Sequence, residues 1–204
     1  MKKLFTTFLL LLWSSLVFGY QLQTSKGVMD VGYSNTEGVK ATYTAVVADY
    51  DPIATATDMV VLTASPTKTI RITKIRLTGD ANGNATSTIY LFKRTALNTG
   101  GTTSTVTVAK NDSTDPASTA TVTKYSVNAS ALGTGVLIHA QHIGLPATAN
   151  PTIAPGEVNW IWGDRPSRTI VLAKGSTESV AVSWGGNAVP TGTTLTMQIE
   201  WTEE

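Results

Sequence analysis

The sequence predicts an all-β protein, an antiparallel β-sandwich of jelly-roll-like arrangement with about ten short strands. Three observations support this prediction. Charged residues make up only 14% of the chain, and the abundant threonine and valine suit strands because branching at Cβ fits a pleated surface. Short apolar runs with a two-residue period recur between clusters of glycine, proline, asparagine and aspartate. Beyond residue 19, no stretch keeps a helical period.

Residues 1–19 are predicted to be a signal peptide or a membrane-targeting segment. Met1-Lys2-Lys3 gives a short basic start, an apolar run extends from Leu4 to Phe18, and the small residue Gly19 follows. The run is shorter than the roughly 20 residues that usually span a bilayer. We therefore expect an exported chain. Contact with a membrane is expected only if this segment is not cleaved.

Residues 20–57 are predicted to form an extended N-terminal arm or linker. They are poor in large aliphatic residues and rich in glycine, threonine, serine and alanine. Within them, residues 39–50 (VKATYTAVVADY) form a candidate first strand, which Asp51-Pro52 ends.

Residues 58–204 are predicted to form the sandwich domain, because strand-like runs follow one another there at short, regular spacing. The last run alternates most clearly, whereas the run 86–95 is apolar on both faces, as in a central strand or one that contacts a partner. Residues 98–104 (NTGGTTS) are predicted to be a loop. The predicted strands are 58–65, 69–80, 86–95, 105–110, 119–128, 135–145, 157–164, 169–175, 178–186 and 193–204.

The run 69–80 contains a change of register. Ile70 and Ile72 share one face of a strand, but Ile75 and Leu77 fall on the other parity. A two-residue period allows all four to face the core only if one residue is extra. We therefore predict a β-bulge near Thr73-Lys74.

The tryptophans decide between a core role and a binding role. Trp160 and Trp162 share one strand face with Val158, and Trp184 and Trp201 each lie in a strand with aliphatic residues on the same face. This arrangement favours the core. The alternative is that they form an exposed platform, the feature that a carbohydrate-binding sandwich would need.

The sequence offers little catalytic chemistry. The absence of cysteine excludes disulfides, thiol catalysis and cysteine metal sites, and the net charge of +1 does not favour nucleic acid as a partner. His139 and His142 would lie on opposite faces of one strand, so they are not expected to share a metal ion. The acids are sparse and lie mostly in turns or near the C-terminus, Glu203 among them. We expect no enzyme activity, no cofactor, no metal ion and no catalytic residue.

Two polar motifs are interpreted as turns. Asp80, Asn82 and Asn84 alternate like the start of a calcium loop, but Ala85 and Leu91 stand where such a loop needs glycine and glutamate. Residues 163–166 (Gly-Asp-Arg-Pro) are interpreted as the corner between two strands and not as an active-site pair, because proline ends a strand.

Longer motifs follow one another colinearly between about residues 70 and 204: IRITKIRLTGDA, IYLFKRTALNTGGT, NDSTDPAST, WIWGDRPSRTIVL and the terminal IEWTEE. As a set they resemble a group of small virion-associated structural proteins of tailed phages and prophages. The resemblance implies a context and supplies no catalytic residues. A secretory leader is unusual in such particles, so the leader acts in membrane targeting or assembly, or the chain is an exported cellular relative.

We expect a non-enzymatic structural protein, a virion-associated subunit of the head-decoration or fibre type that acts by self-association. Its expected partners are further copies of itself or other virion proteins. The alternative is a secreted β-sandwich module that binds carbohydrate or another cell-surface polymer. The expected location is therefore the virion or the extracellular space.

Overall fold

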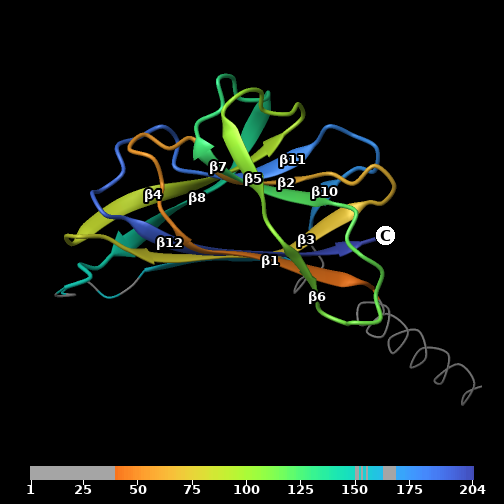
Figure 1. The fold of residues 1–204 in the computed structure, drawn as a ribbon, viewed down its shortest axis with the longest axis horizontal. Helices are drawn as coiled ribbons and strands as arrows, with labels where there is room; N and C mark the ends of the chain where they lie inside the picture. Colours follow the sequence, from red (N-terminus) through yellow and green to blue (C-terminus); the bar gives the residue numbers. More distant parts are fainter. Residues whose placement is uncertain (1–39, 150–151, 153, 155, 163–168) are drawn as a thin grey trace, which may run out of the picture. The chain divides into compact units, whose positions relative to one another are not determined.

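The computed structural model describes residues 40–149, 152, 154, 156–162 and 169–204. Residues 41–204 form one compact unit. In its described part, twelve strands form two antiparallel sheets that face each other, which confirms the predicted all-β sandwich (Figure 1). The jelly-roll arrangement stays a prediction. The described residues contain no helix of the length and apolarity needed to cross a bilayer.

The first sheet, sheet A, has the strand order β10-β3-β12-β1-β6, and β9 pairs with the same edge of β3 as β10. The last strand, β12, lies at the centre of this sheet, between β3 and β1. The strands are β1 (Thr42–Tyr50), β3 (Ile70–Asp80), β6 (Val108–Lys110), β9 (Glu157–Ile161), β10 (Ile170–Leu172) and β12 (Thr194–Glu203).

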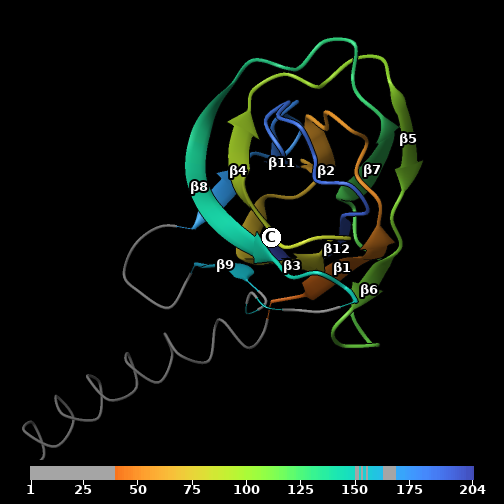
Figure 2. The same ribbon diagram turned by 90° about the vertical axis from the view of Figure 1, so that its left-hand side faces the viewer.

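The second sheet, sheet B, has the order β5-β7-β2-β11-β4-β8. Its two edge strands, β5 and β8, lie on opposite outer sides of the domain (Figure 2). The strands are β2 (Asp58–Thr63), β4 (Ala85–Arg94), β5 (Thr102–Thr105), β7 (Thr121–Val127), β8 (Gly135–Leu145) and β11 (Ser179–Ser183).

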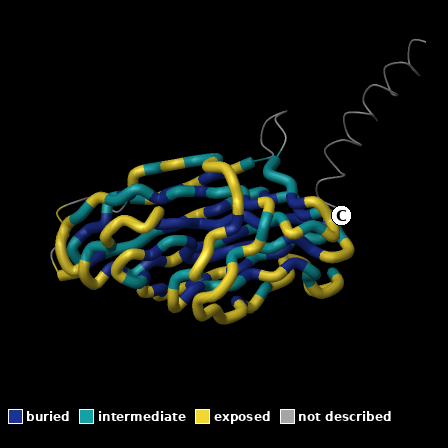
Figure 3. The backbone as a smooth tube through the Cα atoms, turned by 90° about the horizontal axis from the view of Figure 1, so that it is seen from above, coloured by how far each residue is buried: buried dark blue, intermediate teal, exposed yellow. Residues whose placement is uncertain are grey.

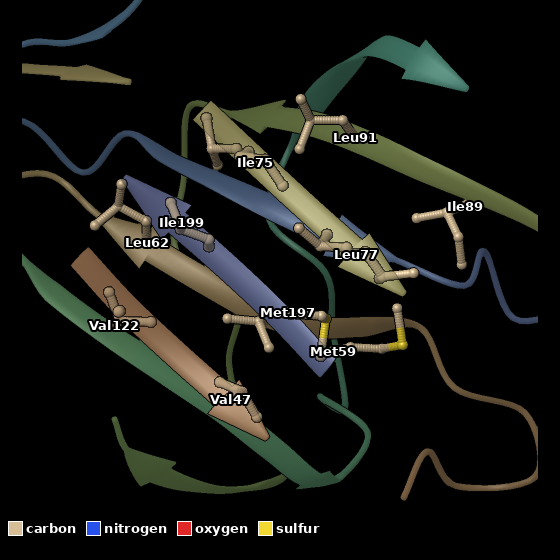
Figure 4. Close-up of a cluster of buried hydrophobic side chains, with 14 of the residues drawn as sticks. Val47, Met59, Leu62, Ile75, Leu77, Ile89, Leu91, Val122, Met197 and Ile199 are labelled. Carbon is tan, nitrogen blue, oxygen red and sulfur yellow. The ribbon is translucent and has the colours of Figure 1, made fainter. Parts of the chain in front are cut away.

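The core lies between the sheets and draws side chains from both (Figure 4). Buried positions follow the interior of the strands, whereas exposed residues gather in the connections (Figure 3). Alternation along strands such as β3 and β12 places apolar residues inside and polar residues outside, as sheet packing requires, whereas β2 and β11 are buried on both faces. The labelled core residues are Val47, Met59, Leu62, Ile75, Leu77, Ile89, Leu91, Val122, Met197 and Ile199.

The predicted bulge in β3 is confirmed. Lys74 pairs with Glu200 and Ile72 pairs with Trp201, so Thr73 is the extra residue. Its hydroxyl donates to Glu200 at 3.1 Å, and its carbonyl accepts from the backbone N–H of Trp162 at 2.8 Å. Because of this extra residue, the isoleucines before the bulge and the apolar residues after it all face the core, each fully buried.

The candidate first strand within residues 39–50 is confirmed as β1, but three assignments differ from the sequence analysis. The first strand, β1, pairs with β12 and β6 inside sheet A, so the sandwich includes residues that were assigned to the arm, and residues 1–39 lie outside the described part. The predicted strand 105–110 is divided between the sheets, because β5 belongs to sheet B and β6 to sheet A. Residues 102–104 were predicted as loop but belong to β5, whose four residues are all exposed and show no apolar alternation.

The prediction that the tryptophans belong to the core is confirmed for three of them. Trp201 and Trp184 are fully buried and Trp160 is 8% exposed. Trp162 is half-buried and packs against the same core.

Candidate interaction surface

Strand β8 has a covered half and a free half. In the C-terminal half, the side-chain amide of Gln141 donates to the carbonyl of Glu157 at 3.1 Å, and the N–H of Gly156 donates to the carbonyl of Gly144 at 3.0 Å. Ile143 is buried there. In the N-terminal half, residues 135–137 are all exposed. The free half therefore presents side chains on both faces of an edge strand.

Four large exposed aliphatic side chains lie on this free half or in the segments next to it, with Val136 and Leu137 on opposite faces of the strand. They are 42–66% exposed, and we call them the β8 patch: Leu97, Leu132, Val136 and Leu137. The β4–β8 ladder continues past Arg94 and Gly135, because Thr95 donates to the carbonyl of Thr134 and Thr99 pairs with Ala131. Leu97 and Leu132 lie between these pairs. The patch thus extends from β8 into the two chain segments that follow the end of its pairing with β4.

A buried ion pair fixes the two loop segments of the patch. The guanidinium of Arg94 donates to both carboxylate oxygens of Asp58, at 2.5 and 2.7 Å, and to the carbonyl of Gly133 at 2.7 Å. Asn98 donates to Asp58 at 2.8 Å and accepts from the N–H of Gly133 at 2.8 Å. Both charged groups are almost fully buried. Leu97 and Leu132, the neighbours of Asn98 and Gly133, are therefore held in place.

Gly133 is required for this arrangement. A Cβ at this position would lie 1.8 Å from the carbonyl oxygen of Ala96, closer than any side-chain carbon can approach backbone. The two loop segments therefore approach each other only with glycine here.

The segment that contains β8 carries no formal charge from Asp, Glu, Lys or Arg, although Lys93 lies opposite Val136 on the neighbouring strand and pairs with Glu178. The sequence from Ser126 to Gly156 contains none of these residues. Edge strands of monomeric proteins are usually short or protected by charges. In the described part, the edge strands β5, β6, β9 and β10 have three to five residues, whereas β8 has eleven. β8 is therefore the long edge without charge protection.

The histidines lie as predicted, on opposite faces of β8. His139 pairs with the buried Leu91, and its ring stacks on Trp160 with ring centroids 5.8 Å apart. His142 is exposed and shares a hydrogen bond of 3.0 Å with the hydroxyl of Thr88. His139 thus packs at the seam between the sheets. Among the described residues, no group of three or more His, Asp or Glu side chains is placed to hold a metal ion.

The motif around Asp80 forms a turn, as predicted. Asp80 ends β3, and Asn84 accepts a hydrogen bond of 2.7 Å from the N–H of Ala147. The side-chain oxygen of Asn84 therefore links the β3–β4 connection to the segment that follows β8. The Asp164-Arg165 pair lies outside the described residues.

Three of the four tryptophans in the described residues are not available for the exposed platform that carbohydrate binding was expected to need. Trp160, Trp184 and Trp201 are all buried, so their ring faces are not available to a sugar. The rings of Tyr90 and Phe92, on the outer face of sheet B, are half-buried and 6.3 Å apart.

Glu203 is a buried carboxylate that the sequence analysis placed only among the terminal acids. It accepts from the hydroxyls of Ser118 and Thr119, from the N–H groups of Thr119 and Ala120, and from the indole N–H of Trp201. Burial raises the pKa of this carboxyl, but the hydrogen bonds outweigh it, so the pKa lies below its ordinary value. The group joins β12 to the segment before β7, which is a structural task.

Sequence reasoning missed the β8 patch and the ion pair beneath it. Leu97 and Leu132 stand in segments with turn-forming residues, where a single leucine carries little information. The signal that could have pointed to this region is the uncharged stretch from Ser126 to Gly156.

Comparison with known proteins found no match to a family model, to a curated protein or to a solved structure.

Proposed function

We propose that this chain is a non-enzymatic structural subunit that acts by self-association. The observation that carries the proposal is the β8 patch: Val136 and Leu137 are exposed on the long edge strand β8, and Leu97 and Leu132 are exposed in the segments next to it. Clustered apolar surface of this kind marks interaction sites in soluble proteins, because its burial releases water.

The patch is pre-formed, which further supports an interface. The buried Asp58–Arg94 pair fixes the segments that carry Leu97 and Leu132, so little conformational entropy is lost when a partner binds. A surface that only tolerated exposed leucines would not need such support.

The test is light scattering on the purified full chain over a wide concentration range. We expect the mean mass to rise with concentration, and Leu137→Glu to reduce this rise because a carboxylate would be buried without a partner. The control is Val46→Glu, since Val46 is also 50% exposed but lies on β1, away from the patch. A wild-type chain that stays monomeric at high micromolar concentration contradicts the proposal, and so does equal loss in both variants.

We also propose that the subunit acts in a virion. This part rests on the motif resemblance over residues 70–204. The test is mass spectrometry of particles purified from cells that produce the chain. We expect peptides of the chain to copurify with capsid proteins through a density gradient. Peptides found only in the particle-free medium contradict the virion and favour a secreted protein.

A further inference from the structure

We infer that Asn82, in the connection between β3 and β4, is a site of spontaneous deamidation in the folded chain. This modification goes beyond the proposed function and does not depend on it. Asn82-Gly83 is the one Asn-Gly pair in the sequence. Glycine has no Cβ beside its backbone nitrogen, so this nitrogen can approach the side-chain carbon of the preceding asparagine.

Both reacting groups are free and exposed in the structure. Asn82 and Gly83 are exposed residues, and the described part of the chain shows no hydrogen bond from the Asn82 side chain or from the Gly83 N–H. The backbone N–H of Asn82 donates to the carbonyl of Thr191 at 3.1 Å, which leaves the bonds after its α-carbon free to rotate. The amide of Asn82 lies against Gly192, where a Cβ would overlap it. Only this packing contact restrains the amide.

The surroundings of Gly83 leave room for the rotation that the reaction needs. Apart from its chain neighbours, no atom lies within 4 Å of the position that a Cβ on Gly83 would occupy. Its φ also lies outside the left-handed region. The backbone of Gly83 can therefore move toward the amide of Asn82 without meeting another part of the protein.

Asn84 provides an internal comparison two residues further along the chain. Its side-chain oxygen accepts from the N–H of Ala147 at 2.7 Å, and its side-chain nitrogen donates to the hydroxyl of Thr152. The residue that follows it, Ala85, carries a Cβ. The amide of Asn84 is therefore held by hydrogen bonds, and the nitrogen that would attack it is more crowded.

The reaction needs only water and a base from the solvent. The Gly83 nitrogen loses its proton to the base and bonds to Cγ of Asn82. The bond from Cγ to the side-chain nitrogen breaks, and this nitrogen takes up a proton and leaves as ammonia. Water then opens the resulting succinimide ring at either carbonyl, which yields aspartate or isoaspartate. Either product carries a new carboxylate, which lowers the formal net charge of +1 by one unit.

The isoaspartyl product changes the spacing of two hydrogen bonds that hold this connection. Ala81 donates to the carbonyl of Pro146 at 3.0 Å, and Asn84 accepts from the N–H of Ala147 at 2.7 Å. Isoaspartate at position 82 adds a carbon to the backbone between Ala81 and Asn84, although their partners are adjacent residues. We therefore expect the isoaspartyl form to have a lower Tm than the unmodified chain.

The experiment follows the full chain at mildly alkaline pH, in its native state and unfolded in urea. Tryptic digestion releases the peptide from Leu77 to Lys93, and its fragment masses distinguish Asn82 from Asn84. Gly83→Ala is the matched variant, because the added Cβ has space around it and no strained φ. It should fold normally and slow only the attack of the nitrogen.

We expect Asn82 to convert in the native chain at a rate within about tenfold of its rate in urea, while Asn84 keeps its amide. Gly83→Ala should slow this conversion by at least about tenfold, the effect of a barrier about 1.4 kcal/mol higher. An amide at Asn82 that stays intact in the native chain would overturn the inference, and conversion in urea alone would show that the fold protects it. Equal rates at Asn82 and Asn84, or an unchanged rate in Gly83→Ala, would contradict it as well.

Discussion

Replacing Asp58 by alanine removes the carboxylate that neutralises a buried guanidinium. The side chain of Arg94 is 7% exposed and would keep one of its three hydrogen bonds, the one to Gly133. Leaving one member of a buried ion pair without its partner costs about 3–5 kcal/mol. For a domain of this size, such a loss lowers Tm by roughly 10 °C. The expected result is a folded variant with a much lower thermal and urea midpoint.

The double variant Asp58→Ala, Arg94→Met shows whether the uncompensated charge is the cause. Methionine keeps an apolar stem and removes the guanidinium, so we expect the double variant to be more stable than Asp58→Ala by at least about 1 kcal/mol. Urea unfolding followed by tryptophan fluorescence measures both free energies. A single variant that loses less than about 1 kcal/mol, or a double variant whose losses simply add, would refute this reasoning.

Three further changes test other parts of the fold. Folding lowers the pKa of Glu203, so this carboxylate stabilises the fold above about pH 4.3, and the stabilisation is lost as the pH falls through the folded pKa. Glu203→Gln should therefore reduce the dependence of stability on pH at acid pH. Urea midpoints measured between neutral and acid pH test this. Asp49 has a φ of 49°, in the left-handed region that glycine adopts easily and valine does not. Asp49→Gly should therefore change the free energy of unfolding by no more than about 1 kcal/mol, whereas Asp49→Val should lower it by about 1–2 kcal/mol. Equal effects of the two variants in thermal melts would contradict a left-handed backbone at this residue. Deletion of Thr73 should destabilise the domain by more than about 4 kcal/mol, because it turns the buried side chains of Ile70 and Ile72 outward. A soluble variant with an unchanged circular dichroism melt would show that the bulge is dispensable.

Much of the fold follows from patterns within single strands. The parity change between Ile72 and Ile75 requires an extra residue between them, and this local argument located the bulge at Thr73. The tryptophans were placed in the core by the same kind of argument. β5 was missed because its four residues, Thr102–Thr105, are all exposed, so their sequence has no alternation of apolar and polar residues.

The candidate surface depends on contacts that the sequence does not encode locally. Arg94 and Asp58 come from different strands of sheet B and meet only after the sheet has formed. Glu203 likewise looked like one of several terminal acids, yet its partners at Ser118 and Thr119 lie far away in the chain. A pattern of periods and turns describes which way a strand faces, but not which distant loop lies over it.

The pairing of β1 with β12 has a consequence for biosynthesis. Thr42 is paired with Thr202, so the centre of sheet A joins the beginning and the end of the described chain. Because strands that far apart in sequence must find each other, the chain has a high contact order and should fold slowly. During translation, sheet A cannot close until β12 has emerged from the ribosome. Until then, β1 and β3 lack the strand that lies between them, and each leaves one row of backbone N–H and C=O groups unpaired.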